Sequence, residues 1–364
     1  MNIITFGTDE HMLDQNSRQH ARLLTYVDMA DSYTAIIFSK KQNFEVVEKG
    51  TLTLIQVPKR FFLWQLRNVY VYLKTHKKER TVISSQDPFE VGIIGYICAK
   101  LLRYPFHVQI HTAIQSTIAQ TESVRSRVQY YMFLFLLKRV DAFRVVSKGI
   151  RNFLIKKGVD ERKIFLSPVI ETLPEGVKER MYTGGTIEIL CVARFVYFKN
   201  LPALIDAFHK FTKEHNAHLT IVGGGPLRKQ LERKIFWHGL KDNVTLLDWV
   251  PNVMDLYKQA DLYIHPSYYE GFGMAIVEAL HFGVPVLATP DVGSIDYITK
   301  ENGYIMSGYL PSQLLQGMEY AVRNLIYLKP DHIANSLRVI SKAENDMIQR
   351  NSLVYAVDHY TYEK

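Results

Sequence analysis

Short apolar runs alternate with segments of helical periodicity along this chain, and the alternation occurs in two series. The first series extends from NIITF at 2–6 to AFRVV at 142–146, and the second from TIEILCVA at 186–193 to PVLAT at 285–289. Strands and helices that alternate at this interval favour parallel βαβ units and doubly wound sheets. The sequence therefore predicts an α/β fold with two Rossmann-like domains.

The length of the chain and a break in the pattern indicate where these domains meet. At 364 residues, the chain has room for two domains of about 150 residues each. Residues 168–186 contain two prolines and three glycines, which is typical of a linker. We expect an N-terminal domain at 1–170, a C-terminal domain at 171–345, and a last helix at 346–364 that returns to the first domain. Because open α/β sheets bind ligands at the carboxyl ends of their strands, the domains are expected to face each other across a cleft.

The cysteines and the apolar runs exclude two classes of protein. Cys98 and Cys191 both lie in apolar runs, which favours buried reduced thiols in a cytoplasmic protein over a disulfide framework. The first residues show neither the basic start nor the long apolar segment of a secretory leader. The longest apolar run, at 130–137, is shorter than the ~20 residues that span a bilayer. We expect a cytoplasmic protein with no membrane span and, since no Cys/His cluster has ligand spacing, no structural zinc.

The net charge of +8 is unevenly distributed between the two halves. Residues 1–170 carry 25 Lys/Arg and 14 Asp/Glu, a net charge of +11, whereas residues 171–364 carry 19 and 22, a net charge of −3. A basic half of this kind favours an anionic partner. A phosphate-bearing acceptor, a membrane face and a nucleic acid all fit that description.

Two glutamates, Glu270 and Glu278, bracket a Gly-Phe-Gly turn in the stretch HPSYYEGFGMAIVEALHFGVPVLAT. A helix that begins at this turn leaves its first backbone N–H groups unpaired, and these groups together with the helix dipole favour a phosphate. Glu278 lies about two turns inside that helix, where it could accept hydrogen bonds from sugar hydroxyls. From spacing alone, an acid in the first turn and a solvated glutamate on the helix surface explain the pair equally well.

This stretch resembles the E-x7-E signature of retaining GT-B glycosyltransferases, particularly family 4, also called glycosyl transferases group 1. CVARFVYFKN at 191–200 is similar to that family's strand followed by an arginine and, five residues later, a lysine. Three further segments follow in the family's order and spacing: IVGGGPLRKQLE at 221–232, VTLLDWVPNVMDLYKQADLYIHPS at 244–267 and DVGSIDYITKENGYIM at 291–306. The resemblance covers about residues 190–306. The glycines of IVGGGP are expected to form only a tight strand-to-helix turn.

The resemblance implies a GT-B fold and a nucleotide-sugar donor site in the second domain. It assigns Arg194 and Lys199 to the donor diphosphate, Glu270 to the donor sugar and Glu278 to the ribose hydroxyls. It further implies that the nucleobase packs near Val250. The phosphate would accept hydrogen bonds from the backbone amides of Gly271, Phe272, Gly273 and Met274.

In the first domain, the resemblance places His111 at the end of the segment VQIH, where it would face the transferred sugar. Catalysis would then proceed on one face of the sugar, with the departing phosphate accepting the proton of the incoming hydroxyl. Fixed cations such as Arg194 and Lys199 stabilise the charge of the leaving diphosphate. Since the sequence has no D-x-D pair, we expect no metal and no other cofactor.

Two departures from the family pattern lie on the acceptor side. Where the family shows Pro-Asn-Gly-Val-Asp, this chain has Pro168-Val169-Ile170-Glu171, and its first loop lacks paired glycines. The stretches 57–80 and 125–139 mix basic residues with large aromatic ones. They fit either membrane-contacting surfaces or core helices with solvated basic ends, and their apolar content favours the core.

The expected function is therefore a metal-independent, retaining hexosyltransferase that acts on a glycan or lipid-linked acceptor in cell-surface polysaccharide or glycolipid synthesis. Its basic first domain could contact an anionic membrane peripherally, and no nucleic acid is expected as a partner. Two alternatives stay open. One is a basic nucleic-acid-binding protein, which the pI of about 9.2 favours. The other is a non-catalytic sugar-binding relative.

Overall fold

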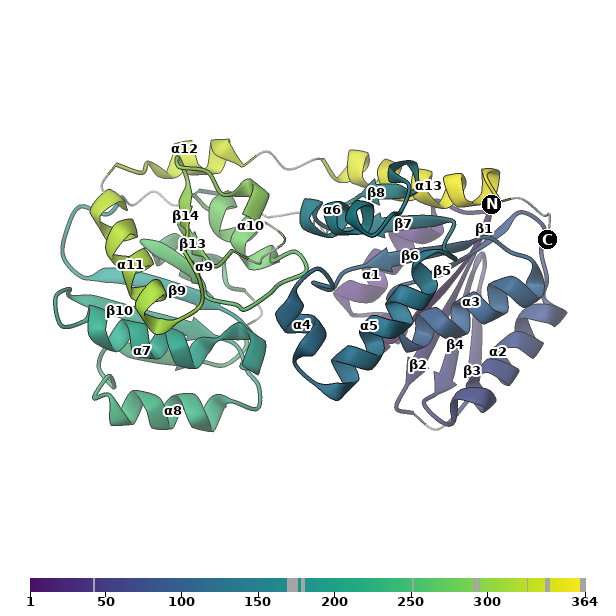
Figure 1. Ribbon diagram of the computed structural model, residues 1–364, viewed down its shortest axis with the longest axis horizontal. Coiled ribbons are helices and arrows are strands. Elements are labelled where there is room, and N and C mark those ends of the chain that lie inside the picture. The colour runs from purple at the N-terminus through teal and green to yellow at the C-terminus, as the bar shows by residue number, and fades with distance from the viewer. Residues whose placement is uncertain are drawn as a thin grey trace. The chain divides into compact units, whose positions relative to one another are not determined.

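The computed structural model describes residues 1–41, 43–168, 176–177, 181–250, 252–290, 293, 295–325, 327–337 and 341–360. The chain forms two compact units (Figure 1). The first unit consists of Met1–Pro168 together with Ala343–Lys364, and the second of Val169–Lys342. Most of the expected linker, residues 169–175 and 178–180, lies outside the described residues.

The first unit contains an eight-stranded sheet in the order β3-β4-β2-β1-β5-β6-β7-β8. All neighbouring strands are parallel except the β3/β4 pair at one edge. The strands are β1 (Asn2–Gly7), β2 (Ser32–Ser39), β3 (Glu45–Lys49), β4 (Leu52–Pro58), β5 (Thr81–Ser85), β6 (Phe106–Ile110), β7 (Ala142–Val145) and β8 (Ile164–Leu166). The sequence pattern did not predict β3, because every residue of this edge strand is exposed and it has no apolar face.

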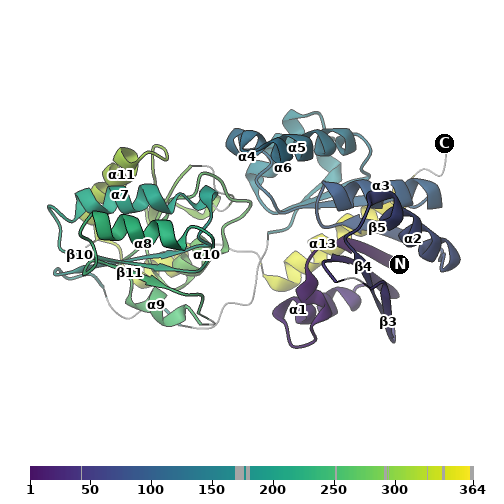
Figure 2. The same cartoon turned by 90° about the horizontal axis from the view of Figure 1, so that it is seen from below.

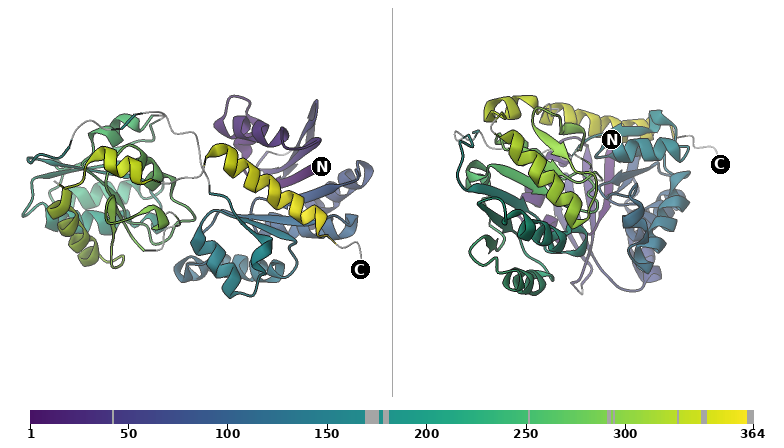
Figure 3. Two further views of the ribbon diagram at one scale, coloured as in Figure 1. Left: turned by 90° about the horizontal axis from the view of Figure 1, so that it is seen from above. Right: turned by 60° about the vertical axis from the view of Figure 1, so that its left-hand side comes forward.

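Helices cover both faces of this sheet (Figures 2 and 3). The connections that lead from β4 to β5 and onward to β8 all cross the sheet in one direction, so right-handed crossovers place their helices on the same face. These are α2 (Phe62–Thr75), α3 (Glu90–Leu102), α4 (Thr117–Thr121), α5 (Val124–Leu137) and α6 (Lys148–Lys156). The opposite face carries α1 (Arg18–Val27) and the last helix, α13 (Lys342–Asp358).

Two helices, the short α4 and the longer α5, follow each other between β6 and β7. The break falls at Ser123, whose Oγ accepts a hydrogen bond from the backbone N–H of Ser126 at 3.0 Å. A serine that caps a helix in this way favours a new start over continuation of the preceding turn. Ser123 therefore sets the start of α5, which is a single helix from Val124 to Leu137.

Helix α13 packs against the first unit and begins at Lys342, earlier than the periodicity predicts. Leu353 and Ala356 lie in the same apolar cluster as residues of β1 and β2. The earlier turns present buried polar residues instead, among them Asn345 and Gln349. Their inward face carries no apolar signal that a sequence pattern could detect.

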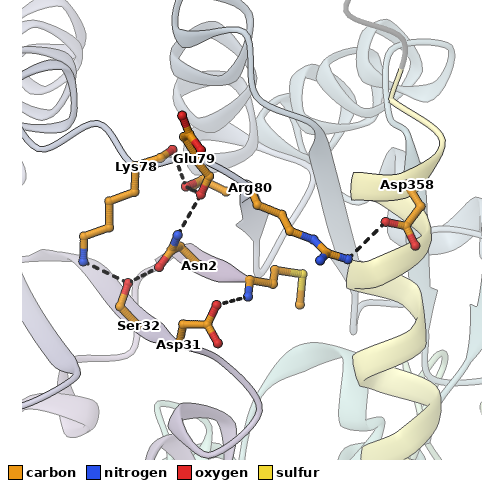
Figure 4. Close-up of polar contacts among 9 residues, drawn as sticks. Asn2, Asp31, Ser32, Lys78, Glu79, Arg80 and Asp358 are labelled. Carbon is orange, nitrogen blue, oxygen red and sulfur yellow. Dashed lines mark hydrogen bonds and ion pairs between the residues drawn. The ribbon is translucent and has the colours of Figure 1, made fainter.

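Polar contacts close the amino ends of β1, β2 and β5 (Figure 4). Ser32 Oγ donates to Asn2 Oδ1 at 2.7 Å, and Lys78 Nζ donates to Ser32 Oγ at 3.0 Å. Arg80, which precedes β5, forms a 3.5 Å ion pair with Asp358 at the end of α13. These contacts connect the strands at their amino ends, which lie opposite to the carboxyl ends of the parallel strands.

The second unit contains a six-stranded parallel sheet in the order β11-β10-β9-β12-β13-β14. Its strands are β9 (Ile187–Val192), β10 (Ala217–Val222), β11 (Val244–Leu247), β12 (Leu262–His265), β13 (Val286–Ala288) and β14 (Gly303–Ile305). One apolar layer joins the sheet to α7 (Leu201–Phe211), α8 (Arg228–Trp237) and α11 (Pro311–Leu325). The other joins it to α9 (Met254–Gln259), α10 (Met274–His281) and α12 (Pro330–Ser336).

Both cysteines are free and buried, as the sequence predicted. Among the described residues, no helix is both long enough and apolar enough to cross a lipid bilayer.

Candidate functional site

The candidate site of the second unit lies at the carboxyl ends of β9 and β12, which are neighbours in the sheet. Lys199 belongs to a short 3-10 turn after β9, and Glu270 belongs to the loop after β12. Lys199 Nζ donates to Glu270 Oε2 and forms an ion pair with it. The fold therefore brings two predicted site residues from separate βα connections into direct contact.

Lys199 is unusually well buried for a lysine, with 8% of its surface exposed. The next residue, Asn200, has a left-handed backbone with φ of 53°, and its Nδ2 donates to the carbonyl of Tyr309 at 2.9 Å. This turn leads directly into α7, which carries a proline in its first turn. The backbone next to Lys199 is thus fixed by the hydrogen bond of Asn200 and by the start of α7.

A buried histidine that the sequence analysis did not identify, His265, completes the group. Its Nε2 lies 3.6 Å from Glu270 Oε2 and 3.0 Å from Ser267 Oγ, and its Nδ1 lies 3.2 Å from Tyr263 Oη. Burial lowers the pKa of His265, so the ring is neutral at neutral pH. His265 ends β12 only five residues before Glu270, and that position within the quoted motif is the signal that could have identified it.

The environment of Glu270 keeps it ionised. Burial by itself would raise the pKa of this carboxyl, but the adjacent His265 ring and the Lys199 charge outweigh burial and hold the pKa at about 2. At neutral pH, Glu270 is therefore an acceptor of hydrogen bonds and not a proton donor.

Glu278 lies in α10 and is half-buried. Its Oε2 accepts a 2.8 Å hydrogen bond from the hydroxyl of Tyr257, a fully buried residue of α9. Burial, followed by the neighbouring Tyr263 and Glu278, raises the pKa of Tyr257 well above its usual value. Tyr257 therefore keeps its proton, and its hydroxyl contacts both Glu278 Oε2 and, at 3.2 Å, the carbonyl oxygen of Ala275.

The Gly-Phe-Gly loop enters α10 through a backbone that favours glycine. Gly273 has a φ of 94° and caps the helix, which begins at Met274. A Cβ atom on Gly293 would lie 1.9 Å from the carbonyl oxygen of Gly271, so two glycine-containing loops touch at this point. Phe272 is buried against Tyr297, with ring centroids 5.9 Å apart.

Arg194 lies beside the same group but is exposed. Its guanidinium carbon is 5.5 Å from the ring centroid of Phe198, and Lys199 Nζ is 5.6 Å from that same centroid. Phe198 in turn stacks on Tyr269, the residue before Glu270, at a centroid distance of 5.0 Å. Arg194 and Lys199 thus share one aromatic ring, which brings the two predicted diphosphate ligands together.

The glycine run after β10 does more than form a turn. A Cβ on Gly223 would lie 2.1 Å from the carbonyl oxygen of Ala193, and a Cβ on Gly225 would lie 2.6 Å from that of Phe195. Both glycines have positive φ values, 144° and 150°. Only glycines allow this loop to pack so closely on the backbone that carries Arg194.

Val250 lies beyond β11 and is the last residue before the undescribed position 251. It packs partly buried against the apolar cluster that contains Tyr257.

His111 belongs to the first unit, whereas the other predicted site residues belong to the second. Its Nε2 lies 3.2 Å from Gln109 Oε1, and that oxygen also accepts a 2.8 Å hydrogen bond from Arg144 Nη1. Because an oxygen cannot donate, His111 carries its proton on Nε2 and leaves Nδ1 as an acceptor. Burial, followed by the charges of Arg144 and Arg22, lowers the pKa of His111 to about 3, so the ring is neutral.

Arg144 is itself buried in β7 and was not identified from the sequence. Its Nε donates to Ser167 Oγ at 3.0 Å, and that hydroxyl donates to Asn345 of α13 at 2.7 Å. Burial lowers the pKa of Arg144 from its ordinary value. A charged residue inside an apolar strand was the available signal, but its partners depend on strand register.

One group of potential metal ligands occurs among the described residues, outside the motifs above. Glu214, His215 and Glu319 place their ligand atoms within 4.8 Å of one another. His215 Nε2 already contacts Glu319 Oε2 at 3.0 Å, and Glu214 is exposed. A histidine and a glutamate that pair on the surface explain this group without an ion.

Comparison with known proteins gives a family match over the second unit. The sequence model of the family described as glycosyl transferases group 1 matches residues 181–335. The matched range includes Lys199, Glu270, Glu278 and the loop between the two glutamates.

Curated relatives match parts of this chain. An uncharacterised glycosyltransferase of Methanocaldococcus jannaschii is 35% identical over 134 residues, which are 36% of this chain and 34% of the relative. The alpha-monoglucosyldiacylglycerol synthase of Streptococcus pneumoniae is 28% identical over 225 residues, 57% of this chain and 51% of the relative. These alignments span about a third and about half of the relatives' own lengths.

Solved structures match the whole fold. The lipopolysaccharide outer core galactosyltransferase WaaB in its apo form superposes with a TM-score of 0.75 at 14% identity and covers 97% of this chain and 99% of its own. HepE of Anabaena in complex with UDP gives 0.68 at 16% identity and covers 98% of both chains. The predicted fold class, GT-B with two Rossmann-like α/β domains, is confirmed.

Proposed function

We propose that the protein is a retaining glycosyltransferase with a nucleotide-sugar donor, because the glycosyl transferases group 1 model matches residues 181–335. The observation that carries the proposal is the ion pair between the buried Lys199 and the half-buried Glu270. A nucleotide sugar has an anionic diphosphate next to a ring of hydroxyls. A fixed cation beside an ionised carboxylate complements both parts of that ligand.

In the proposed reaction, Lys199 and Arg194 bind the donor diphosphate. The bond between the anomeric carbon and the diphosphate oxygen breaks, and the acceptor oxygen bonds to that carbon on the same face. The acceptor proton moves to the departing phosphate oxygen, so that no external base is required. The two cations stabilise the charge that develops on the leaving group, and for this reason we propose a metal-independent enzyme.

Glu270 is proposed to accept hydrogen bonds from the sugar hydroxyls. With a pKa of about 2, it cannot supply a proton at neutral pH, and its pairing with Lys199 opposes a nucleophilic role. His111 is proposed to act from the other domain. Its neutral ring and unprotonated Nδ1 suit acceptance of a hydrogen bond from a hexose hydroxyl, which supports hydrogen bonding and not acid catalysis.

The remaining donor contacts are proposed around α10. Glu278, oriented by Tyr257, would accept hydrogen bonds from the ribose hydroxyls. Val250 would lie near the nucleobase. The phosphate would bind the first backbone amides of the helix and its entering loop, those of Gly271, Phe272, Gly273 and Met274.

The substrate class and the location are also proposals. HepE was solved with UDP, which makes UDP-hexoses the first donors to test. The pneumococcal relative is named as a synthase of a glucosylated diacylglycerol, and WaaB as a lipopolysaccharide galactosyltransferase, which supports a glycan or lipid-linked acceptor in surface polysaccharide or glycolipid synthesis. A cytoplasmic location is supported by Cys98 and Cys191, which are both free and buried and form no disulfide.

A thermal-shift screen with UDP-, GDP- and ADP-sugars, followed by a transfer assay with the donor that stabilises the protein, tests this proposal. We expect one donor series to raise the melting temperature of the wild type and of Lys234→Ala, a control that removes the surface pair with Asp206. The same donor should fail to stabilise Lys199→Ala. If no nucleotide sugar stabilises the wild type, or if Lys199→Ala transfers at the wild-type rate, the proposal is wrong.

A further inference from the structure

Helix α5 of the first unit carries an apolar stripe that faces solvent. Val124, Val128, Tyr131 and Phe135 recur at intervals of four, three and four residues, and all four are exposed, Val124 by 73% and Tyr131 by 69%. This spacing forms one face of a helix, the face that normally packs against a core. Here the opposite side of α5 supplies the core contacts, since Phe133, Leu136 and Leu137 are buried.

Helix α2 shows the same feature at its start. Phe61, Phe62 and Leu63 are three consecutive exposed apolar residues, with 87% of Phe61 and 75% of Leu63 accessible. The outward side of the helix continues through Val71, which is also exposed. The prediction that residues 57–80 and 125–139 are core helices is therefore wrong for their outer sides, because sequence pattern alone does not tell which apolar side of a helix is buried.

The two stripes lie on one face of the unit. Helix α3 packs against both α2 and α5, and the three helices cover the same side of the sheet (Figures 1 and 2). Between the stripes, α3 adds the exposed Leu101. We call the outward surface of these helices and their flanking residues, 59–139, the α2–α3–α5 face.

The chain segment that carries this face is strongly basic, although Arg80 within it pairs with Asp358 of α13 on the other side of the sheet. Residues 59–139 contain 13 Lys/Arg and 4 Asp/Glu, a net charge of +9, whereas the whole chain has +8. All of these lysines and arginines are exposed. Some of them cover neighbouring aromatic rings: the Arg139 guanidinium carbon lies 4.0 Å from the ring centroid of Phe135, and that of Arg60 lies 5.2 Å from the ring of Trp64.

We propose that the α2–α3–α5 face docks on the surface of an anionic lipid bilayer. The apolar stripes would enter the boundary between headgroups and acyl chains, and the surrounding cations would pair with phosphate headgroups. An arginine stacked on an aromatic ring suits that boundary, because the ring can contact the acyl chains while the guanidinium group stays hydrated among the headgroups. The proposal does not depend on the proposed transfer reaction.

The exposed aliphatic residues of this face favour a bilayer over a nucleic acid as the partner. Surfaces that bind single strands combine cations with aromatic rings on which bases stack. Leu63, Val71, Val124 and Val128 offer no stacking surface, but each gains by leaving water at a lipid boundary. An exposed apolar surface of this extent is rare on a protein that remains free in solution.

Vesicle flotation with the full-length protein tests the proposal without any sugar donor. We expect binding to vesicles of phosphatidylcholine mixed with phosphatidylglycerol, and much weaker binding to phosphatidylcholine alone. The charge variant Arg67→Glu/Lys74→Glu/Arg127→Glu should bind the mixed vesicles about a hundredfold more weakly. The matched control Lys210→Glu/Lys229→Glu/Arg233→Glu reverses three exposed cations of the second unit and should bind like the wild type.

A second pair of variants tests the apolar part of the face. Val124→Ser/Val128→Ser/Tyr131→Ser should bind about tenfold more weakly, whereas Phe236→Ser/Trp237→Ser/Tyr327→Ser, which changes three exposed residues of the second unit, should not. The charge variant keeps every apolar residue, so its vesicle binding tests the proposal even if the serine variant fails to fold. Absence of wild-type binding to mixed vesicles, unchanged binding of the charge variant, or binding of single-stranded RNA in place of vesicles would overturn the proposal.

Discussion

The two units of this protein use charge in opposite ways. In the second unit, one cation and one carboxylate meet at the carboxyl edge of the sheet, and Lys199 is almost completely buried. In the first unit, the segment 59–139, which carries the α2–α3–α5 face, has a net charge of +9, and all of its lysines and arginines are exposed. A buried pair selects a ligand by geometry and is poorly screened by salt, whereas an exposed basic face attracts any anionic surface and is readily screened. The difference is consistent with the two proposals, a small-molecule site in the second unit and an extended docking surface in the first.

The largest effect is expected from removal of the buried cation. Lys199→Ala should lower kcat for transfer about a thousandfold, because it removes a fixed charge from the leaving diphosphate and leaves Glu270 without its partner. Arg194→Ala should cost about ten- to a hundredfold, since this side chain is exposed and its charge is partly screened. Steady-state kinetics with Lys234→Ala as control measures both. Equal losses in the Lys199 and Arg194 variants would contradict the distinction between buried and exposed charge.

Salt should weaken ligand binding by the first unit much more than ligand binding by the second. Between about 0.02 M and 0.5 M NaCl, affinity for anionic vesicles should fall about a hundredfold, while the affinity for the donor should change several-fold at most. Flotation and donor titration on one protein preparation measure the two affinities. A donor affinity that falls as steeply as vesicle binding would show that the donor is also held by exposed charge.

Acid should destabilise the first unit through its buried neutral histidines. Burial, followed by the Arg144 charge, lowers the pKa of His107 to about 3, and its ring contacts Ser84 at 2.8 Å and Ser352 of α13 at 3.1 Å. Since the unfolded pKa is about 6.5, the unfolded state binds the extra proton first, so stability is full above about pH 6.5 and is lost as pH falls toward about 3. At about pH 5, the free energy of unfolding should be about 2 kcal/mol lower on account of His107.

Denaturant unfolding of a Trp237→Phe/Trp249→Phe protein measures this loss, because Trp64 is then the remaining tryptophan and belongs to the first unit. In the same background, His107→Asn should show a shallower dependence on pH between about 5 and 7. Identical pH dependence with and without His107 would contradict the explanation.

The smallest effect is expected for an exposed ion pair of the first unit. Asp358→Asn removes the 3.5 Å contact between α13 and Arg80 and should change the free energy of unfolding by less than about 1 kcal/mol. Leu353→Ala, in the buried contact of the same helix, should cost about 2 to 4 kcal/mol. The Trp64 reporter serves for both, and a larger loss in the Asp358 variant would mean that exposed charge, not apolar contact, holds α13 in place.

The sequence predicted much of the second unit and less of the first. Alternating periodicity was sufficient for the βαβ order, and the quoted motifs were sufficient to identify Lys199 and Glu270. Gln109 and Arg144 escaped prediction because their contact depends on strand register, which places them opposite each other across β6 and β7. The first turns of α13 escaped because polar residues form their buried side.

Two other features were hidden for different reasons. The orientation of the α5 stripe could not be predicted because both sides of that helix are apolar, and only packing decides which side is covered. His265 stands inside a recognised motif, yet its proximity to Glu270 depends on how the loop after β12 folds back on the strand.

Calorimetric titration of UDP, GDP and ADP into the wild type and Lys199→Ala tests the central claim most directly. One of the three nucleotides should bind the wild type, and its affinity should fall at least about tenfold in Lys199→Ala, with little change in Lys234→Ala. If none of the three binds the wild type, or if the nucleotide that binds does so equally well without Lys199, the buried pair is not a donor site.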